Sequence, residues 1–397
     1  MENTGVIARG ITTPIFRQGD DIVNMICDSI MECAENEGFT LNDKDIIGVT
    51  EAVVGRVQGN YASLEQISKD VRTKFGGGEN AVSALGVVFP ILSRNRFAQT
   101  LKGIAGGCEK LYIQLSYPSD EVGNKLIDLS DCDEKGINPY TDNLTEKQFR
   151  EIFGMETVHS FTGIDYIEYY KEISGNCEIL FSNDPTFILN YTKNVLCCDI
   201  HTRHRTKALV KNAGAECCLC LDEILNQSVD GSGFSEYGLL GSNKATETSV
   251  KLFPRDTKEF VLSLQKELTR RTGSTVEAMV YGDGCFKDPA GGIWELADPV
   301  VSPAFTDGLM GTPSELKIKY IADNDYGDLS GEALTKSIRE RIRSKEKTAT
   351  DIKAALGTTP RRIYDLVGSL CDLVSGSGDR GTPVVLIQNY FKNYASE

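Results

Sequence analysis

The stretch that decides the fold of this chain is Asp45-Ile46-Ile47-Gly48-Val49-Thr50-Glu51-Ala52-Val53-Val54-Gly55-Arg56-Val57-Gln58-Gly59. Its first five residues include Ile46, Ile47 and Val49, and this short apolar run predicts a buried strand. The charged residues Glu51 and Arg56 follow soon after it. The stretch therefore brings two charged side chains to the region where a core strand ends.

Elements on both sides of this stretch mix strands with amphipathic helices. Towards the N-terminus, we expect a strand within 5–16 that ends in a turn at Thr12, Thr13 and Pro14, and then a helix over 20–36. Towards the C-terminus, the sequence predicts helices over 64–75, 96–104, 256–271 and 330–345, and strands over 85–92, 276–281 and 384–388. Thr359 and Pro360 are typical of the N-cap and first position of a last helix. Together these elements predict an α+β fold.

The middle of the chain follows a different rhythm. Strand-like runs at 111–115, 177–181, 194–198 and 216–220 alternate with helix-like runs at 146–153, 164–173 and 203–213. Such alternation predicts a parallel sheet covered by helices. We therefore expect an inserted α/β subdomain over 106–226, within a core made of 1–105 and 227–397.

The bulk composition indicates an ordinary globular protein with an acidic surface. The 397 residues are 40% hydrophobic, and the formal net charge is −15. An acidic surface repels nucleic acids and anionic membranes, so neither is an expected partner. The first ten residues lack the basic and apolar regions of a signal peptide, which favours a cytoplasmic location with reduced cysteines.

A glycine-rich segment near the C-terminus is the first candidate for ligand binding. Gly376, Gly378 and Gly381 have the spacing G-x-G-x-x-G. The predicted order is helix, loop, strand, whereas a dinucleotide-binding motif needs a strand before the glycines and a helix after them. Two interpretations stay open: a helix C-cap followed by a turn, or a loop whose backbone N–H groups and Arg380 hold phosphate.

Carboxylates near the predicted strand 276–281 and on the last helix are candidates for binding a metal. Asp283 lies between two glycines at the end of that strand, where it can reach a hard cation such as Mg²⁺ with little crowding. Further possible oxygen ligands are Asp288, Glu295 and Asp298. The last helix carries a polar stripe that consists of Arg361, Asp365, Ser369 and Asp372. The alternatives are a tight turn at Asp283 and a solvated face on the helix.

The cysteines also suggest a zinc site, which the predicted local structure argues against. Cys217 and Cys220 have the spacing C-x-x-C, and Cys197, Cys198, His201 and His204 precede them. Zinc binds such ligands. Residues 217–220 lie in a predicted strand, however, where side chains three apart point to opposite faces. The chain also lacks the P-loop, H-E-x-x-H and G-x-S-x-G motifs, so chemistry led by metal, carboxylate and Arg fits better.

Three blocks of sequence, in this order, resemble the γ-glutamyl ligases that extend coenzyme F-420, a deazaflavin. The blocks are Gly10–Ile15 with Gly19-Asp20-Asp21 and 45–59; Gly241-Ser242-Asn243 with 252–256 and the strand before Asp283; and 365–383. The chain differs from the family pattern at two places where the family has Asp or Asp-Thr. These places are Leu240 and the pair Tyr281-Gly282.

The resemblance implies a core like that of the γ-glutamyl ligases and an activity that joins L-glutamate to the deazaflavin phosphodiester. It implies GTP as co-substrate, two divalent cations (Mg²⁺ or Mn²⁺), an anionic acceptor and a homodimer. The nucleotide-binding residues that it implies are Thr12, Thr13, Pro14, Ile15, Glu51, Arg56, Asn243, Gly376, Ser377, Gly378, Asp379, Arg380 and Gly381.

For catalysis, the hypothesis assigns roles to Arg56, Asp283, Arg361 and Asp365. For metal binding, it assigns Asp283 together with Asp365 or Asp379. Two other functions stay open at this point. One is an NTP-dependent amide ligase with a different amino acid or carboxylate substrate, and the other is a regulator that binds nucleotide without catalysis.

Overall fold

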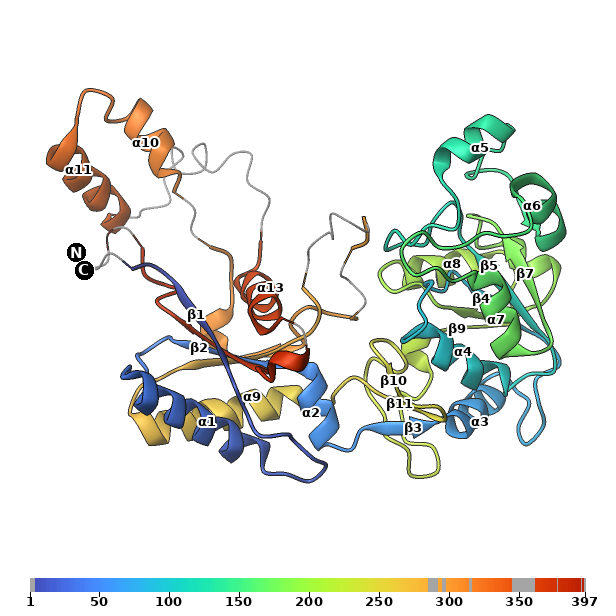
Figure 1. The fold of residues 1–397 in the computed structure, drawn as a ribbon, viewed down its shortest axis with the longest axis horizontal. Coiled ribbons are helices and arrows are strands. Elements are labelled where there is room, and N and C mark those ends of the chain that lie inside the picture. Colours follow the sequence, from blue (N-terminus) through green and yellow to red (C-terminus); the bar gives the residue numbers. More distant parts are fainter. Residues whose placement is uncertain are drawn as a thin grey trace.

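The chain forms two units that lie side by side, which we call the core unit and the α/β unit (Figure 1). The computed structural model describes residues 4–284, 292–294, 298–313, 316–344, 361–376, 378–393 and 395. Both ends of the chain lie on the core unit, at the left of Figure 1. The mixture of helices with parallel and antiparallel strands confirms the predicted α+β class.

The core unit is built on a five-stranded sheet with the order β1-β14-β2-β12-β13. Its strands are β1 (Ile7–Ile11), β2 (Ile46–Thr50), β12 (Glu277–Tyr281), β13 (Ala304–Phe305) and β14 (Val384–Gln388). Strands β2 and β12 are parallel, and the other neighbouring pairs are antiparallel. The two chain ends therefore meet in one sheet, since β14 lies between β1 and β2.

Helices cover both faces of this sheet, as Figure 1 shows. Helices α1 (Ile22–Glu37) and α9 (Thr257–Thr272) pack on one face against Ile47 and Val49. Helix α13 (Ile363–Ser375) packs on the other face against Ile46. Because side chains alternate along a strand, β2 contributes to both cores, and this explains its continuous apolar run. Helices α10 (Ile318–Asn324) and α11 (Gly331–Arg343) lie outside these layers.

The α/β unit is built on a six-stranded sheet with the order β6-β7-β5-β4-β8-β9. Its strands are β4 (Leu85–Val88), β5 (Leu111–Leu115), β6 (Leu144–Thr145), β7 (Cys177–Phe181), β8 (Asn194–Cys197) and β9 (Cys217–Cys220). Its helices are α3 (Leu64–Lys74), α4 (Phe97–Ala105), α5 (Leu129–Lys135), α6 (Glu146–Phe153), α7 (Tyr166–Ser174) and α8 (Arg203–Asn212). All neighbouring strands are parallel except β6 and β7, so the predicted parallel layer is confirmed.

The α/β unit begins earlier in the chain than the predicted boundary at residue 106. Strand β4 pairs in parallel with both β5 and β8, so it lies inside this sheet rather than in the core unit. The apolar side chains of α3 and α4 belong to the same hydrophobic core. The predicted alternation starts at the strand 111–115 and therefore leaves out one strand and two helices of this unit. A small sheet of β3 (Tyr61–Ser63), β11 (Ser249–Lys251) and β10 (Asn243–Thr246) lies where the chain passes between the units.

Two local differences from the predicted elements concern the functional region. Helix α2 (Glu51–Val57) follows β2 without a break, whereas no helix was predicted there. The last helix is described from Ile363 onward, and its predicted start at Thr359 and Pro360 lies outside the described residues. Among the described residues, no helix combines the length and apolar character that a membrane span requires.

Candidate active site

A cavity of about 360 Å³ opens where three connections of the core unit meet. We call it the loop cavity. Its walls come from the turn after β1, the start of α2, the end of β12, and the connection from α13 to β14. The lining residues are Thr13, Pro14, Ile15, Phe16, Thr50, Ala52, Val53, Arg56, Tyr281, Asp372, Ser375, Gly376, Gly378, Gly381, Thr382 and Pro383.

Backbone hydrogen bonds hold these walls together. The amide of Thr13 donates to the carbonyl of Gly381 at 3.2 Å, and the amide of Thr50 donates to the carbonyl of Pro383 at 3.0 Å. These bonds join segments that are more than 300 residues apart in the sequence because β14 lies between β1 and β2. Because the last strand lies inside the sheet, the first and the third block of the family resemblance meet in one cavity.

The connection after α13 has the predicted helix–loop–strand order. Gly376 ends the helix at φ 62°, a left-handed conformation that favours glycine. A Cβ at this position would lie 2.9 Å from Cζ of Arg380, so the glycine also gives room to that guanidinium. Ser377 lies outside the described residues. This loop both caps the helix and forms a wall of the cavity. It therefore agrees with both interpretations of the glycines, a helix C-cap with a turn and a loop that holds phosphate.

Beside the loop cavity lies a group of four carboxylates, which we call the carboxylate cluster. It consists of Glu51, Asp283, Asp298 and Asp372. The amide of Asp283 donates to Asp298 Oδ2 at 2.8 Å, and the amide of Gly284 donates to Asp372 Oδ2 at 2.9 Å. These bonds connect the end of β12 to α13.

Gly282 allows this close approach. A Cβ on Gly282 would lie 2.5 Å from Asp298 Oδ2 and 2.9 Å from the carbonyl oxygen of Val300. Gly282 belongs to the pair at which the chain differs from the family pattern. The glycine leaves space for the carboxylate of Asp298 beside the end of the strand.

Two basic side chains pair with the cluster among the described residues. Arg96 donates to Asp283 Oδ2 at 2.6 Å and to Asp298 Oδ1 at 2.8 Å. Lys251 donates to the two oxygens of Glu51 at 3.0 and 2.8 Å. Four carboxylates and two cations leave these groups with a formal charge of −2. An excess of negative charge on oxygen donors attracts a hard divalent cation such as Mg²⁺ or Mn²⁺. In this structure, however, no three of these four carboxylates bring ligand oxygens within 4.8 Å of one another.

The pKa values of the cluster reflect burial and this excess charge. Burial raises the pKa of Glu51, the charge of Lys251 lowers it and the charge of Asp298 raises it, so that the net pKa is about 7. Burial raises the pKa of Asp372, and Asp298 adds to the rise. Burial alone would lower the pKa of Arg96, but the carboxylates of Asp298 and Asp283 outweigh it and raise that pKa. A cation in the cluster would favour the charged form of each carboxylate.

The structure does not bring all the predicted site residues to this place. Asp365 lines a second hollow of about 480 Å³, which it shares with Asp283 and Asp298. Arg361 and Asp379 are exposed, and neither lines the loop cavity. Asn243 is half-buried at the start of β10, also outside the cavity lining. Glu51 lies in the carboxylate cluster, and Thr12 belongs to the wall of a neighbouring hollow.

The predicted metal set of Asp283 with Asp365 or Asp379 therefore differs from the cluster in the structure. Asp298 and Asp372 were visible in the sequence, as a nearby oxygen ligand and as part of the helix stripe. Spacing along a helix does not show which member of the stripe meets the end of β12. Arg96 had no signal in the sequence, because it reaches the cluster from the other unit.

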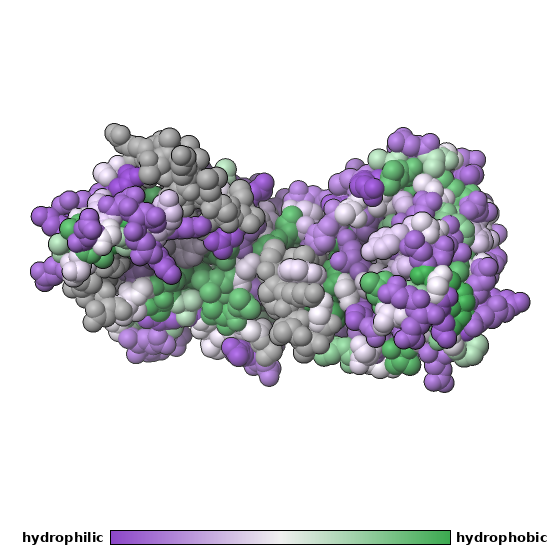
Figure 2. Space-filling view, turned by 90° about the horizontal axis from the view of Figure 1, so that it is seen from above, coloured by the Kyte–Doolittle hydropathy of each residue, from purple (hydrophilic) through white to green (hydrophobic). Residues whose placement is uncertain are grey.

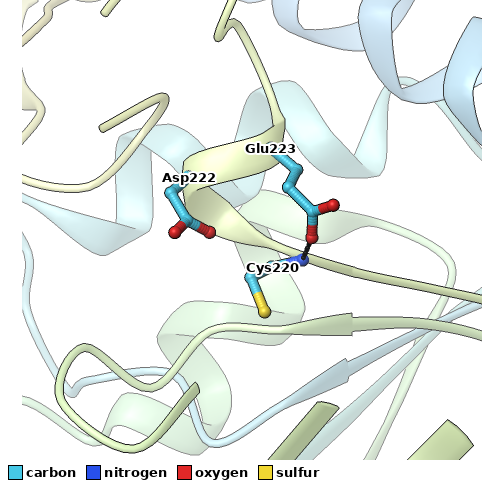
Figure 3. A group of neighbouring side chains, drawn as sticks. All are labelled: Cys220, Asp222 and Glu223. Carbon is cyan, nitrogen blue, oxygen red and sulfur yellow. Dashed lines mark hydrogen bonds between the residues drawn. The ribbon is translucent and has the colours of Figure 1, made fainter. Parts of the chain in front are cut away.

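Among the described residues, the group of three possible ligands whose atoms all lie within 4.8 Å of one another is in the α/β unit and consists of Cys220, Asp222 and Glu223. Figure 3 shows that the Cys220 thiol points away from the Glu223 carboxylate, which accepts from the Cys220 amide at 2.9 Å. Asp222 and Glu223 already pair with Arg203 and Lys207, respectively. Cys217 packs in a different hydrophobic cluster from Cys218 and Cys220. The predicted alternation of the two C-x-x-C thiols is thus confirmed, and it argues against a zinc site there.

Comparison with known protein families gives a match over nearly the whole chain. Residues 10–389 match the family model described as F420-0:Gamma-glutamyl ligase. The match includes the loop cavity, the carboxylate cluster and the α/β unit. No curated protein matches the chain.

Proposed function

The chain belongs to the F420-0:gamma-glutamyl ligase family, and from this premise we propose that it is a GTP-dependent and divalent-metal-dependent ligase. In this proposal it forms an amide bond between L-glutamate and a deazaflavin phosphodiester. One observation carries the proposal. The glycine loop, the turn after β1 and the start of α2 meet in one cavity whose wall includes Asp372 of the carboxylate cluster.

The loop cavity is the proposed nucleotide site. Its volume of about 360 Å³ lies within the usual range for a small-molecule pocket. Apolar walls at Ile15, Phe16 and Val53 suit a base, and the glycine loop suits phosphate because its backbone can approach closely. Arg56 is exposed at the cavity and offers a planar cation that matches phosphate oxygens.

The carboxylate cluster is the proposed metal site. Glu51, Asp283, Asp298 and Asp372 would supply oxygen ligands for Mg²⁺ or Mn²⁺ once the ion draws their oxygens closer together than they lie in this structure. A divalent cation held there would neutralise charge on the phosphate groups during transfer. Asp372 lines the cavity and belongs to the cluster, so it connects the two proposed sites.

The proposed reaction has two steps. An oxygen of the acceptor carboxylate attacks the γ-phosphorus of GTP, and the bond from that phosphorus to GDP breaks. The amine of glutamate then attacks the resulting acyl carbon, phosphate leaves, and the amine loses a proton. The chain's own part is to orient the phosphates through Arg56 and the glycine loop, because correct positioning contributes much of the rate in such transfers.

The homodimer and the cytoplasmic location are further parts of this proposal. Exposed apolar side chains of the core unit support an interface, among them Ile15, Met310 and Leu373. Figure 2, which views the molecule from above, shows a group of hydrophobic residues on this unit, whereas the α/β unit mixes hydrophilic and hydrophobic residues.

The Arg56→Met variant tests the nucleotide site. We expect KM for GTP to rise by about 10- to 100-fold, since a charge-assisted contact to phosphate contributes about 1.5–3 kcal/mol. The change is measured by steady-state kinetics and by binding of a fluorescent GTP analogue. Arg17→Met is the control, because Arg17 is exposed on the connection between β1 and α1, which forms another wall of the cavity, but does not itself line it. An unchanged KM in Arg56→Met would contradict the assignment.

A phosphate-release assay tests the function itself. The protein is incubated with GTP or ATP, Mg²⁺ or Mn²⁺, glutamate and the deazaflavin phosphodiester. We expect release of phosphate that needs both glutamate and the acceptor, together with a product whose mass is higher by one glutamyl residue. Release with another amino acid or carboxylate would instead identify a different amide ligase. Nucleotide binding without any turnover would indicate a non-catalytic regulator.

A further inference from the structure

Tyr281 lies at the floor of the loop cavity. It is the last residue of β12, and its ring packs in the hydrophobic cluster between the core sheet and α13. Only 1% of the residue is exposed, although it belongs to the lining of the cavity. A core residue therefore reaches the cavity with one end of its side chain.

That end is the hydroxyl group. It donates to the carbonyl of Pro383 at 3.5 Å, and the side chains of Ser375 and Thr50 affect its pKa through hydrogen bonding. All three neighbours line the loop cavity, like Tyr281 itself. The hydroxyl thus lies where the start of α2 meets the connection from α13 to β14.

The hydrogen bond to Pro383 holds the hydroxyl only weakly. Its length of 3.5 Å exceeds the usual range for an O–H···O bond, about 2.5–3.0 Å. The same carbonyl already accepts from the amide of Thr50 at 3.0 Å. The hydroxyl proton of Tyr281 is therefore available to a stronger acceptor that enters the cavity.

The phenol of Tyr281 is an uncharged donor at neutral pH. Burial raises its pKa, and the hydrogen bonds with Ser375 and Thr50 offset only part of the rise. A protonated phenol donates one hydrogen bond, and the phosphate oxygens of a nucleotide are strong acceptors. The hydroxyl therefore suits an oxygen of a phosphate group.

The position of this hydroxyl corresponds to the phosphate end of the proposed nucleotide site. Ser375 directly precedes the glycine loop, and Asp372 lies about one turn earlier on α13. The apolar walls that suit a base, at Ile15 and Phe16, come instead from the turn after β1. Tyr281 thus lies beside the backbone that is proposed to hold the phosphates.

We propose that Tyr281 is a catalytic residue whose hydroxyl donates a hydrogen bond to an oxygen of the γ-phosphate during its transfer. The proposal rests on the nucleotide site of the proposed function and adds a residue to it. No covalent bond of Tyr281 forms or breaks, and the hydroxyl keeps its proton. A fixed donor of this kind stabilises negative charge on the phosphate oxygens in the transition state. The family pattern has Asp at this position, so the chain has an uncharged donor where the pattern has a carboxylate.

The Tyr281→Phe variant tests the proposal, because it removes the hydroxyl and keeps the ring. We expect kcat in the phosphate-release assay to fall by about 100-fold, at the lower end for loss of one such donor. Binding is measured separately by calorimetry, without glutamate or acceptor, with GDP and with a GTP analogue whose β–γ bridge is an imido group. We expect affinity for the analogue to fall by about 3- to 10-fold and affinity for GDP to stay within about twofold, since only the analogue has a γ-phosphate.

Tyr117→Phe is the matched control. Tyr117 is 0% exposed, its hydroxyl donates to the carbonyl of Asp142 at 2.7 Å, and it does not line the loop cavity. We expect its kcat and both affinities to stay within about twofold of the wild type. Its thermal midpoint should fall at least as far as that of Tyr281→Phe, because the lost hydrogen bond is shorter. A loss of kcat in Tyr281→Phe alone then reports a role at the cavity rather than the loss of a buried hydroxyl.

Two results would overturn the proposal. One is a kcat in Tyr281→Phe within about threefold of the wild type. The other is an equal loss of affinity for the analogue and for GDP, which would make the hydroxyl a support of the glycine loop. Either result, together with glutamate-dependent phosphate release by the wild type, would leave the ligase function intact. If the wild type shows no turnover, a loss of affinity confined to the analogue would support the contact with the γ-phosphate and reject the proposed reaction.

Discussion

Replacement of Asp372 with Asn is expected to lower kcat/KM of the ligase reaction by about 100- to 1,000-fold, as loss of one preorganised electrostatic contact does in other active sites. Asn keeps the shape of the side chain, and its oxygen can still accept from the amide of Gly284. The variant should therefore fold normally. What it loses is the negative charge at the point where the loop cavity meets the carboxylate cluster, and with it a ligand of the proposed metal.

Asp365→Asn is the matched control on the same helix. Asp365 lies seven residues before Asp372 and lines the second hollow rather than the loop cavity. We expect its kcat/KM to stay within about threefold of the wild type, because surface and rim substitutions usually have small effects. Both variants are compared in the phosphate-release assay. If Asp365→Asn is the more damaging change, the metal set inferred from the sequence is preferred over the cluster.

Replacement of Gly48 with Ala is expected to destabilise the core unit by about 3 kcal/mol, at the upper end of the usual cost of overpacking. Gly48 lies in the middle of β2, on the face of the sheet that α13 covers. A Cβ there would lie 2.4 Å from the Sγ atom of Cys371 and 3.3 Å from Cδ1 of Tyr281. Cys371 and Tyr281 are 0% and 1% exposed, so neither can move into solvent. The effect is measured by chemical denaturation.

A second substitution tests the cause of this loss. Cys371→Ala removes the sulfur atom nearest to the new methyl group, so the double variant should be more stable than Gly48→Ala alone. We expect a coupling energy of about 1–2 kcal/mol, which is typical of residues in direct contact. Gly5→Ala is the control, since a Cβ there meets no atom within 4 Å. If Gly48→Ala were as stable as the wild type, α13 would not pack against β2 as closely as the short distance from Gly48 to Cys371 indicates.

Gly48→Ala also has a functional consequence. Helix α13 carries Asp372 and leads into the glycine loop, so a helix pushed away from β2 would displace both. Ligase activity should fall together with stability in this variant, and it should recover in part in the double variant. Asp372→Asn should lower activity without lowering stability, which separates the two effects.

The sequence by itself determined the elements that depend on local pattern. The strands at 111–115, 177–181 and 384–388 were predicted with their observed bounds, because a short apolar run between turn residues specifies a buried strand. The helix 146–153 was found in the same way, from its amphipathic period. Three ordered blocks of residues were enough to indicate the family, and the match over 10–389 confirms it.

Only the tertiary structure decided which charged groups meet. Strand β4 belongs to the α/β sheet because it pairs with β5 and β8, which lie 26 and 109 residues further along the chain by their first residues (111 − 85 and 194 − 85). Asp372 meets Gly284, and Arg96 meets Asp283 and Asp298, across 88, 187 and 202 residues. Periodicity describes the faces of one helix or strand, whereas these contacts depend on how separate elements pack. The residues of the carboxylate cluster were therefore only partly visible in the sequence, and the cation from the second unit was not visible at all.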